Sequence, residues 1–255
     1  MILDAIYNKD CLDGMKEIPD RSIDLILCDL PYGTTACKWD TVIPFEQLWE
    51  HYNRITKDTA AIVLFGSEPF STHLRMSNIA QFKYDWIWEK TTAGGFVHAK
   101  NAPMKKHEII SVFSRASIGH KNLLGERRMN YEPFEAKTVG TKQVKQKPET
   151  LGARPKQDGK KYEAMTGFPT SILKYKNETG YHPTQKPVPL LEFLIMTYTC
   201  TGVVILDNCF GSGSTLIAAV NTERHYVGFE LEQKYFEIAQ RRLCEVAFSI
   251  KRENP

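Results

Sequence analysis

The stretch from Val203 to Glu230 constrains the fold of this chain most strongly. A short apolar run, Val203–Leu206, is followed by a glycine-rich turn at Asp207–Thr215 and by a helical segment at Leu216–Asn221. A second apolar run, His225–Phe229, then ends in the acid Glu230. A strand, a glycine-rich turn, a helix and a second strand with a terminal acid are typical of a nucleotide-binding half of a doubly wound α/β sheet. We therefore expect an α/β protein with a largely parallel sheet.

The turn favours a particular kind of ligand. Gly211 and Gly213 allow the backbone to approach a ligand closely, but Leu216 stands where a dinucleotide-binding turn has its third glycine. Asp207 precedes the turn, and a carboxylate disfavours a pyrophosphate and suits a cation. Glu230 lies where an acid usually binds ribose hydroxyls. The alternative is that the turn only tightens the start of a helix. A nicotinamide dehydrogenase is disfavoured by the missing glycine.

A second buried strand carries the other half of the expected site. Ile23–Cys28 is mostly apolar and is followed by Asp29-Leu30-Pro31-Tyr32-Gly33. An acid at the carboxyl end of a buried strand lies where open α/β sheets bind their ligands. We expect the strands that end at Asp29 and Asp207 to be neighbours at the switch point of the sheet.

Composition sets limits on the class of protein. A chain of 255 residues with 42% hydrophobic and 25% charged residues suits one α/β domain with a smaller appendage. No apolar run is long enough to span a membrane, and the first residues do not resemble a signal peptide. The six cysteines form no Cys-x-x-Cys pair, so reduced thiols in a cytoplasm are favoured over disulfides or a zinc site, and we expect no metal.

The charge of the chain is unevenly distributed. Eleven lysines and arginines but only five acids lie between Lys121 and Lys161, so this segment carries +6 while the whole chain carries +3. It has few aliphatic residues and no clear periodicity. One interpretation is a solvated, partly disordered insertion, and the other is a segment that contacts nucleic-acid phosphates. Upstream of it we expect strands at Phe82–Trp88 and Glu108–Phe113, with a loop at Lys90–Phe96 between them.

Several motifs together resemble one family. Asp29-Leu30-Pro31-Tyr32 resembles the Asp-Pro-Pro-Tyr motif of amino-methylating DNA methyltransferases, with Leu30 in place of the first proline. The segment from Leu206 to Thr215 is similar to that family's cofactor motif, although Asn208 and Cys209 shift its aromatic residue to Phe210. His182-Pro183-Thr184-Gln185-Lys186-Pro187 matches a further cofactor motif. The order of catalytic motif, basic segment and cofactor motif is that of the β class.

The resemblance implies a fold and a domain organisation. The fold would be a permuted doubly wound, Rossmann-like methyltransferase sheet with a basic recognition insert. Residues 1–114 would form the catalytic half, residues 115–180 the target-recognition insert and residues 181–255 the cofactor-binding half. Double-stranded DNA would be the partner. A homodimer and a separate restriction endonuclease are further partners that the family admits.

The resemblance also implies site residues and a cofactor, S-adenosylmethionine. The implied catalytic residues are Asp29, Leu30, Pro31 and Tyr32. The implied cofactor-binding residues are Asp10, Cys11, Asp29, Thr184, Lys186, Asp207, Phe210, Gly211, Ser212, Gly213, Ser214, Thr215 and Glu230. The basic residues expected on DNA are Arg127, Arg128, Lys142, Lys145 and Lys147.

Some of these residues have a second interpretation. Asp10 could instead cap the helix that starts at Cys11, and Lys186 could either bind the methionine carboxylate or cap a loop. His107 and Glu108 are favoured as structural residues.

The expected reaction is transfer of a methyl group to N6 of adenine in DNA, because an Asp at position 29 goes with adenine in this family. The alternatives are methylation of cytosine N4 and a non-catalytic DNA-binding Rossmann protein.

Overall fold

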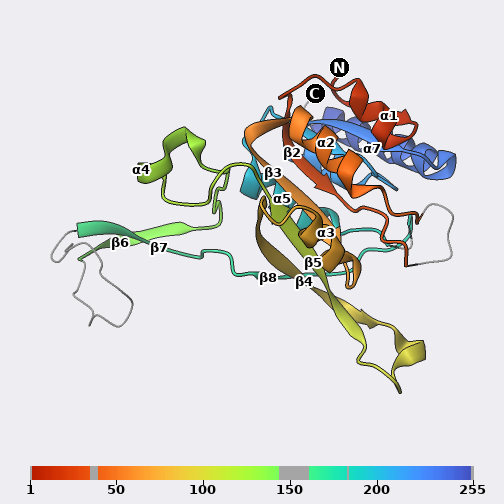
Figure 1. Cartoon of the computed structure of the whole chain (residues 1–255). Coiled ribbons are helices and arrows are strands. Elements are labelled where there is room, and N and C mark those ends of the chain that lie inside the picture. Colours follow the sequence, from red (N-terminus) through yellow and green to blue (C-terminus); the bar gives the residue numbers. More distant parts are fainter. Residues whose placement is uncertain (1, 35–39, 144–160, 183, 254–255) are drawn as a thin grey trace. The chain divides into compact units, whose positions relative to one another are not determined.

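The computed structural model describes residues 2–34, 40–143, 161–182 and 184–253 (Figure 1). The chain divides into two compact units. One comprises Met1–Glu132 and Ser171–Pro255, and the other comprises Pro133–Thr170. The larger unit is built on one sheet, and the smaller unit is inserted into it between two segments of the chain. No helix in the described ranges is both long and apolar enough to cross a membrane.

The sheet of the larger unit has eight strands in the order β1-β10-β9-β2-β3-β5-β4-β8. Only β5 runs antiparallel to its neighbours. The strands are β1 (Ala5–Asn8), β2 (Ile23–Cys28), β3 (Thr56–Gly66), β4 (Phe82–Gly94), β5 (Lys105–Phe113), β8 (Ile172–Tyr175), β9 (Val204–Asp207) and β10 (His225–Glu230). A sheet of this kind confirms the predicted α/β, Rossmann-like fold class.

The centre of the sheet is β2, all six residues of which are buried. Such a strand reads as a continuous apolar run because both of its faces are covered. On one side β2 pairs with β3, and on the other side Leu25 and Ile26 lie opposite Ile205 and Leu206 of β9. The predicted neighbourhood of the strands leading to Asp29 and Asp207 is therefore confirmed.

Helices cover both faces of this sheet. They are α1 (Cys11–Lys16), α2 (Phe45–Ile55), α3 (Phe70–Ser77), α5 (Val188–Tyr198), α6 (Ser214–Asn221) and α7 (Gln233–Glu253), with short turns at α4 (Lys121–Leu124), η1 (Phe96–His98) and η2 (Gly125–Arg127). Alternation along β2 assigns the faces: Ile26 packs in the core with α1 to α3, and Leu25 packs in the core with α5 to α7. The result is three layers, helix–sheet–helix.

Two segments differ from the sequence-based expectations. The expected loop at Lys90–Phe96 is wrong in its first part, because β4 continues to Gly94, which pairs with Lys105. Within the expected insert, β8 is a strand of the main sheet and pairs with β4. Both departures have the same cause. These segments are polar and weakly patterned, so their sequence does not show that pairing with a neighbouring strand makes them extended.

The smaller unit contains an antiparallel pair of strands, β6 (Lys137–Gln143) and β7 (Lys161–Thr166). Two stretches of the basic segment therefore have regular structure. Residues 144–160, which include Lys145 and Lys147, lie outside the described residues.

We predict that Gly14→Ala destabilises the larger unit. A Cβ at Gly14 would lie 2.3 Å from a ring carbon of Phe229, whose side chain is buried, so α1 and β10 would have to separate. Overpacking of this kind costs about 1–3 kcal/mol. Urea unfolding followed by circular dichroism measures the loss. Gly94→Ala is the control, because a Cβ there has no neighbour closer than 4.0 Å. Equal stability of the two variants would contradict the prediction.

Candidate active site

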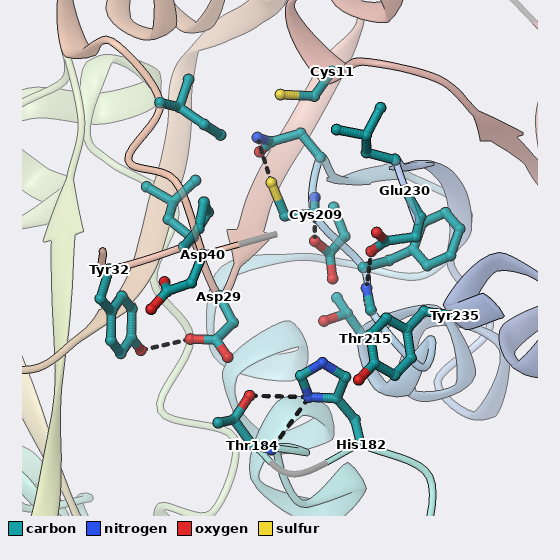
Figure 2. Close-up of a pocket in the computed structure, with 18 of the residues that line it drawn as sticks. Cys11, Asp29, Tyr32, Asp40, His182, Thr184, Cys209, Thr215, Glu230 and Tyr235 are labelled. Carbon is teal, nitrogen blue, oxygen red and sulfur yellow. Dashed lines mark hydrogen bonds between the residues drawn. The ribbon is translucent and has the colours of Figure 1, made fainter. Parts of the chain in front are cut away.

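A pocket of about 400 Å³ opens at the carboxyl ends of β1, β2, β9 and β10, the edge where an open α/β sheet binds its ligand (Figure 2). Almost every residue that the sequence singled out as catalytic or cofactor-binding lines this pocket. These residues are Asp10, Cys11, Asp29, Leu30, Pro31, Tyr32, Thr184, Lys186, Asp207, Phe210, Gly211, Ser212, Ser214, Thr215 and Glu230. Gly213 lies behind the wall, where a Cβ would come within 2.9 Å of the Cβ of Ala239.

Asp29 and Tyr32 are held in a fixed geometry at one end of the pocket. The hydroxyl of Tyr32 donates a hydrogen bond of 2.5 Å to Oδ1 of Asp29, and its ring stacks on Phe70 with centroids 4.9 Å apart. Asp40 holds the next two residues, because its carboxylate accepts hydrogen bonds of 2.8 Å from the backbone N–H groups of Gly33 and Thr34. The strand end therefore presents a carboxylate and an aromatic ring together.

The ammonium of Lys186 connects Asp29 to a second carboxylate. Its Nζ binds Oδ2 of Asp29 and lies 3.3 Å from Oε2 of Glu108, whose other oxygen binds Nζ of Lys90. Burial raises the pKa of the Asp29 carboxyl, and the charge of Lys186 opposes that rise. The two carboxylates raise the pKa of Lys186 despite its burial, so the ammonium stays charged. The ionised form of Asp29 thus depends on Lys186.

The glycine-rich turn and Glu230 form the other end of the pocket. Gly211 and Gly213 have φ angles of 52° and 82°, in the left-handed region that glycine adopts most readily. One oxygen of Glu230 accepts a hydrogen bond of 2.7 Å from the Gly211 N–H, and the other accepts one of 2.9 Å from the Glu232 N–H. These bonds lower the pKa of Glu230, but burial outweighs them and raises it. A carboxylate is thereby positioned beside the turn.

Asp10 caps a helix and also lines the pocket. Its carboxylate caps α1 by accepting hydrogen bonds from the N–H groups of Leu12, at 2.8 Å, and Asp13, at 3.3 Å. The same residue lines the pocket. The helix cap therefore fixes the position of a carboxylate at the edge of the site.

The two departures in the cofactor motif produce a cysteine-lined wall. Cys209 lies near Cys11, and Asn208 is buried, with its side-chain oxygen accepting a hydrogen bond of 2.5 Å from the Tyr52 hydroxyl. Burial raises the pKa of Cys28, beneath this wall, to about 12, so this thiol is protonated at neutral pH. The aromatic ring of Phe210 is 4% exposed and packs against Gly228.

The charge of the pocket favours a cationic ligand. Its lining includes more carboxylates than lysines; the carboxylates are those of Asp10, Asp29, Asp40, Glu108, Asp207 and Glu230, and the lysines are Lys9 and Lys186. Burial raises the pKa of Asp207 to about 7, so a neighbouring positive charge would favour its ionised form. Within the described ranges no group of histidines, cysteines or acids is arranged to hold a metal ion.

Comparison with known families decides what kind of enzyme carries this site. Residues 23–241 match the family described as N6/N4 DNA methylase. The chain belongs to this family. The predicted membership in the amino-methylating DNA methyltransferases is therefore confirmed, and the methylase has its catalytic and cofactor motifs in one pocket.

Named relatives span most of the methylase. It is 28% identical over 280 aligned residues to the type II methyltransferase M.HinfI of Haemophilus influenzae, covering 96% of this chain and 69% of that protein. It is 27% identical over 278 residues to the type II methyltransferase M2.MboI of Moraxella bovis, covering 97% and 90%.

Solved structures share the fold of the methylase. The cytosine-N4-specific PvuII DNA methyltransferase superposes with a TM-score of 0.66 at 14% identity, covering 94% of this chain and 86% of that one. The M1.HpyAVI–SAM complex superposes with a TM-score of 0.58 at 22% identity, covering 93% and 98%.

Sequence reasoning missed several residues of the site. Glu108, favoured as structural, lines the pocket and contacts Lys186. His182 and Tyr235 also line it, with ring centroids 4.3 Å apart, and burial and nearby lysines lower the pKa of His182 to about 4, so it is neutral. His182 opens the motif that also contains Thr184 and Lys186, and this position was the sequence signal that could have identified it. Glu108 was considered but favoured as structural, because its contact with Lys186 depends on how β5 pairs with β3 and β4.

Of the residues expected on DNA, Arg127 and Arg128 do not line this pocket. Arg127 ends η2, and Arg128 follows it and donates a hydrogen bond of 3.2 Å to the carbonyl of Tyr131. Lys142 lies on β6 of the smaller unit, opposite Tyr162, and is exposed. Lys145 and Lys147 fall outside the described part of the chain.

We predict that Lys186→Met moves the acid limb of the pH–rate profile to higher pH. Without the ammonium, burial raises the pKa of Asp29 further, so the carboxylate is protonated over a wider range and activity is regained only as the pH rises. The profile of kcat/KM measures the shift. Lys57→Met is the matched control. Lys57 also pairs with an acid, Asp24 of β2, at 2.7 Å, but neither residue lines the pocket. An unshifted acid limb in Lys186→Met would contradict the role of the ammonium.

Proposed function

We propose that the methylase transfers a methyl group from S-adenosylmethionine to N6 of adenine in double-stranded DNA. The observation that carries this proposal is the carboxylate of Asp29, held by Tyr32 and Lys186 at the carboxyl end of β2 and facing the pocket. The family membership supplies the reaction class, and the side chain at position 29 supports adenine as the base.

The charged groups that line the pocket suit S-adenosylmethionine. The cofactor carries a sulfonium and an ammonium but no phosphate, and the pocket is rich in carboxylates. Glu230 and Asp10 are placed to accept hydrogen bonds from ribose and adenine, and the left-handed turn at Gly211 leaves the backbone open to close approach. When bound, the cofactor supplies an electrophilic methyl group. A sulfonium near Asp207 would also favour the ionised form of that acid.

Asp29 and Leu30 would act on the target amino group. The lone pair of an exocyclic amine is delocalised into the base, and two acceptors aimed at its N–H bonds favour a pyramidal nitrogen with a localised lone pair. The Asp29 carboxylate and the Leu30 carbonyl are the acceptors we assign. The carboxylate would also stabilise the positive charge that develops on nitrogen during transfer.

Tyr32 would hold the base. A target base must leave the duplex to reach an enclosed site, and an aromatic ring stabilises the extruded base by stacking. Such a stack contributes about 1–3 kcal/mol. The hydroxyl of Tyr32 is bonded to Asp29, so the ring and the carboxylate are oriented together.

Cytosine N4 is the second candidate, because the PvuII enzyme, with which this fold superposes well, is cytosine-N4-specific. The same two acceptors serve either amino group. These acceptors therefore do not choose between the two bases, and we propose adenine because the family resemblance associates an Asp at position 29 with adenine.

The basic segment between Lys121 and Lys161 would contribute phosphate contacts, with Arg127, Arg128, Lys142, Lys145 and Lys147 as the assigned residues. Both named curated relatives are type II methyltransferases, which supports site-specific modification paired with a separate restriction endonuclease. We also propose that the methylase forms a homodimer, because the family resemblance is compatible with one.

We predict that Asp29→Ala lowers kcat by at least about a hundredfold, the scale of losing one electrostatic stabiliser of the transition state. S-Adenosylmethionine should still bind, because the turn at Gly211 and Glu230 is left intact. Calorimetry measures binding and transfer of labelled methyl measures turnover. Asp58→Ala, which removes a surface carboxylate, is the control. Near-normal turnover of Asp29→Ala at saturating cofactor would contradict the assigned role.

We predict that DNA methylated in vitro with labelled cofactor yields labelled N6-methyladenine on nucleoside mass spectrometry. Sequencing of modified bases in the same DNA would give the recognition site. Label in N4-methylcytosine alone would replace adenine by cytosine in the proposal. No label in either base would contradict the proposed function.

A further inference from the structure

Two strands of the sheet extend beyond their neighbours. The last residue of β3, Gly66, lies opposite Ile109 of β5, and β8 covers β4 only as far as Lys90. Residues 91–107 therefore form a two-stranded projection with a turn at its end, which we call the β4–β5 arm. Figure 1 shows the β4–β5 arm projecting away from the body of the sheet.

The β4–β5 arm starts beside the active site. Gly66 ends a strand parallel to β2, so the arm leaves the sheet at the same carboxyl edge as Asp29. At its base, Lys90 binds Glu108, which lines the pocket and lies 3.3 Å from Lys186. A ligand large enough to cover the pocket mouth would also meet the arm.

The end of the arm is an ordered turn with an apolar tip. The N–H of His98 donates to the Gly95 carbonyl at 2.9 Å, and the N–H of Ala102 donates to the His98 carbonyl at 2.9 Å. This turn leaves Phe96 79% exposed and Val97 88% exposed, the two highest values among the large hydrophobic residues described. Two large apolar side chains are thus held outward on a backbone that is hydrogen-bonded within itself.

The charge around this tip has one sign. Within the arm, residues 91–107, the sequence contains no aspartate or glutamate, and it contains the lysines Lys100, Lys105 and Lys106; Lys106 pairs with Glu89 at the base of the arm at 3.2 Å. A two-stranded ribbon is marginally stable in water, and exposed apolar side chains are unfavourable there, so the arm suits a bound partner. A polyanion complements the lysines, whereas a second copy of the arm would repel them.

We propose that the β4–β5 arm contacts DNA next to the target base, with its lysines on phosphates and Phe96 inserted into the base stack. This proposal rests on the proposed function, which supplies the DNA and the extruded base. Extrusion of a base leaves a gap in the duplex, and apolar side chains are known to enter base steps as wedges. The ring of Phe96 would restore the stacking that the departing base removes, and Val97 would lie beside it.

The test compares two short duplexes that differ only in one abasic site, which is a gap already formed. Fluorescence anisotropy measures their affinity for the full chain with cofactor present. The wild type should bind the abasic duplex more tightly. Phe96→Ala should weaken that binding roughly 5- to 150-fold, the equivalent of a stacking contribution of about 1–3 kcal/mol, and should abolish the preference.

Two further variants separate the parts of the proposal. Lys100→Ala should weaken binding to both duplexes alike and lower the log–log salt slope by about 0.9. Phe248→Ala is the matched aromatic control: Phe248 is 59% exposed but lies 13 residues, or about 20 Å of helix, beyond the pocket residue Tyr235 on α7. It should leave both affinities unchanged.

The outcomes distinguish this proposal from the proposed function. Wild-type methylation of DNA together with an unchanged abasic preference in Phe96→Ala would overturn the insertion and leave the methylation standing. A change in sedimentation coefficient of Phe96→Ala without any change in DNA affinity would assign the tip to contact between copies and overturn it as well. Absence of DNA methylation by the wild type would instead refute the proposed function.

Discussion

The parallel pairing of β2 with β9 is the constraint on which the site depends. Two strands from opposite ends of the sequence lie side by side, with Leu25 opposite Ile205. Their carboxyl ends therefore deliver Asp29 and Asp207 to one edge of the sheet. The chain passes from β2 to β3 on one side of this pair and from β9 to β10 on the other side, so the strand order reverses direction between β2 and β9. Open α/β sheets bind ligands in the crevice at such a point. The catalytic and cofactor halves of the family's motifs meet there although more than 170 residues separate them.

Electrostatics then decides what the site can do. A carboxylate buried alone would take up a proton, and burial does raise the pKa of Asp29. The ammonium of Lys186, itself only 5% exposed, opposes that tendency, and Glu108 and Lys90 continue the network so that acids and bases alternate. Buried ion pairs contribute little net stability, so this arrangement is better explained by the charge state it imposes. Lys186 thereby favours the ionised form of Asp29 in a partly buried position.

The sequence was most informative where one segment determines its own environment. The apolar run of β2, the turn at Gly211 and the acid that ends β10 each predict a local structure, and their order along the chain predicts the sheet. The resemblance to the family then placed Tyr32 and Lys186 in one site. Register across strands was not accessible in this way. Glu108 joins the site only because β5 pairs with both β3 and β4, and the partner of Lys186 depends on packing that sequence spacing does not encode.

Base specificity would likewise depend on contacts that a single segment does not determine. The proposed acceptors, Asp29 and the Leu30 carbonyl, would serve any exocyclic amino group, so they do not by themselves separate adenine from cytosine. Discrimination would therefore depend on the walls of the slot and on the segments that approach the duplex. Gly33 and Thr34, whose backbone N–H groups are hydrogen-bonded to the Asp40 carboxylate, lie beside the pocket. The β4–β5 arm leaves the same edge. Because neither segment is part of the buried core, their sequences can change without disturbing the strands that hold the reacting groups, and one chemistry can serve different DNA sites.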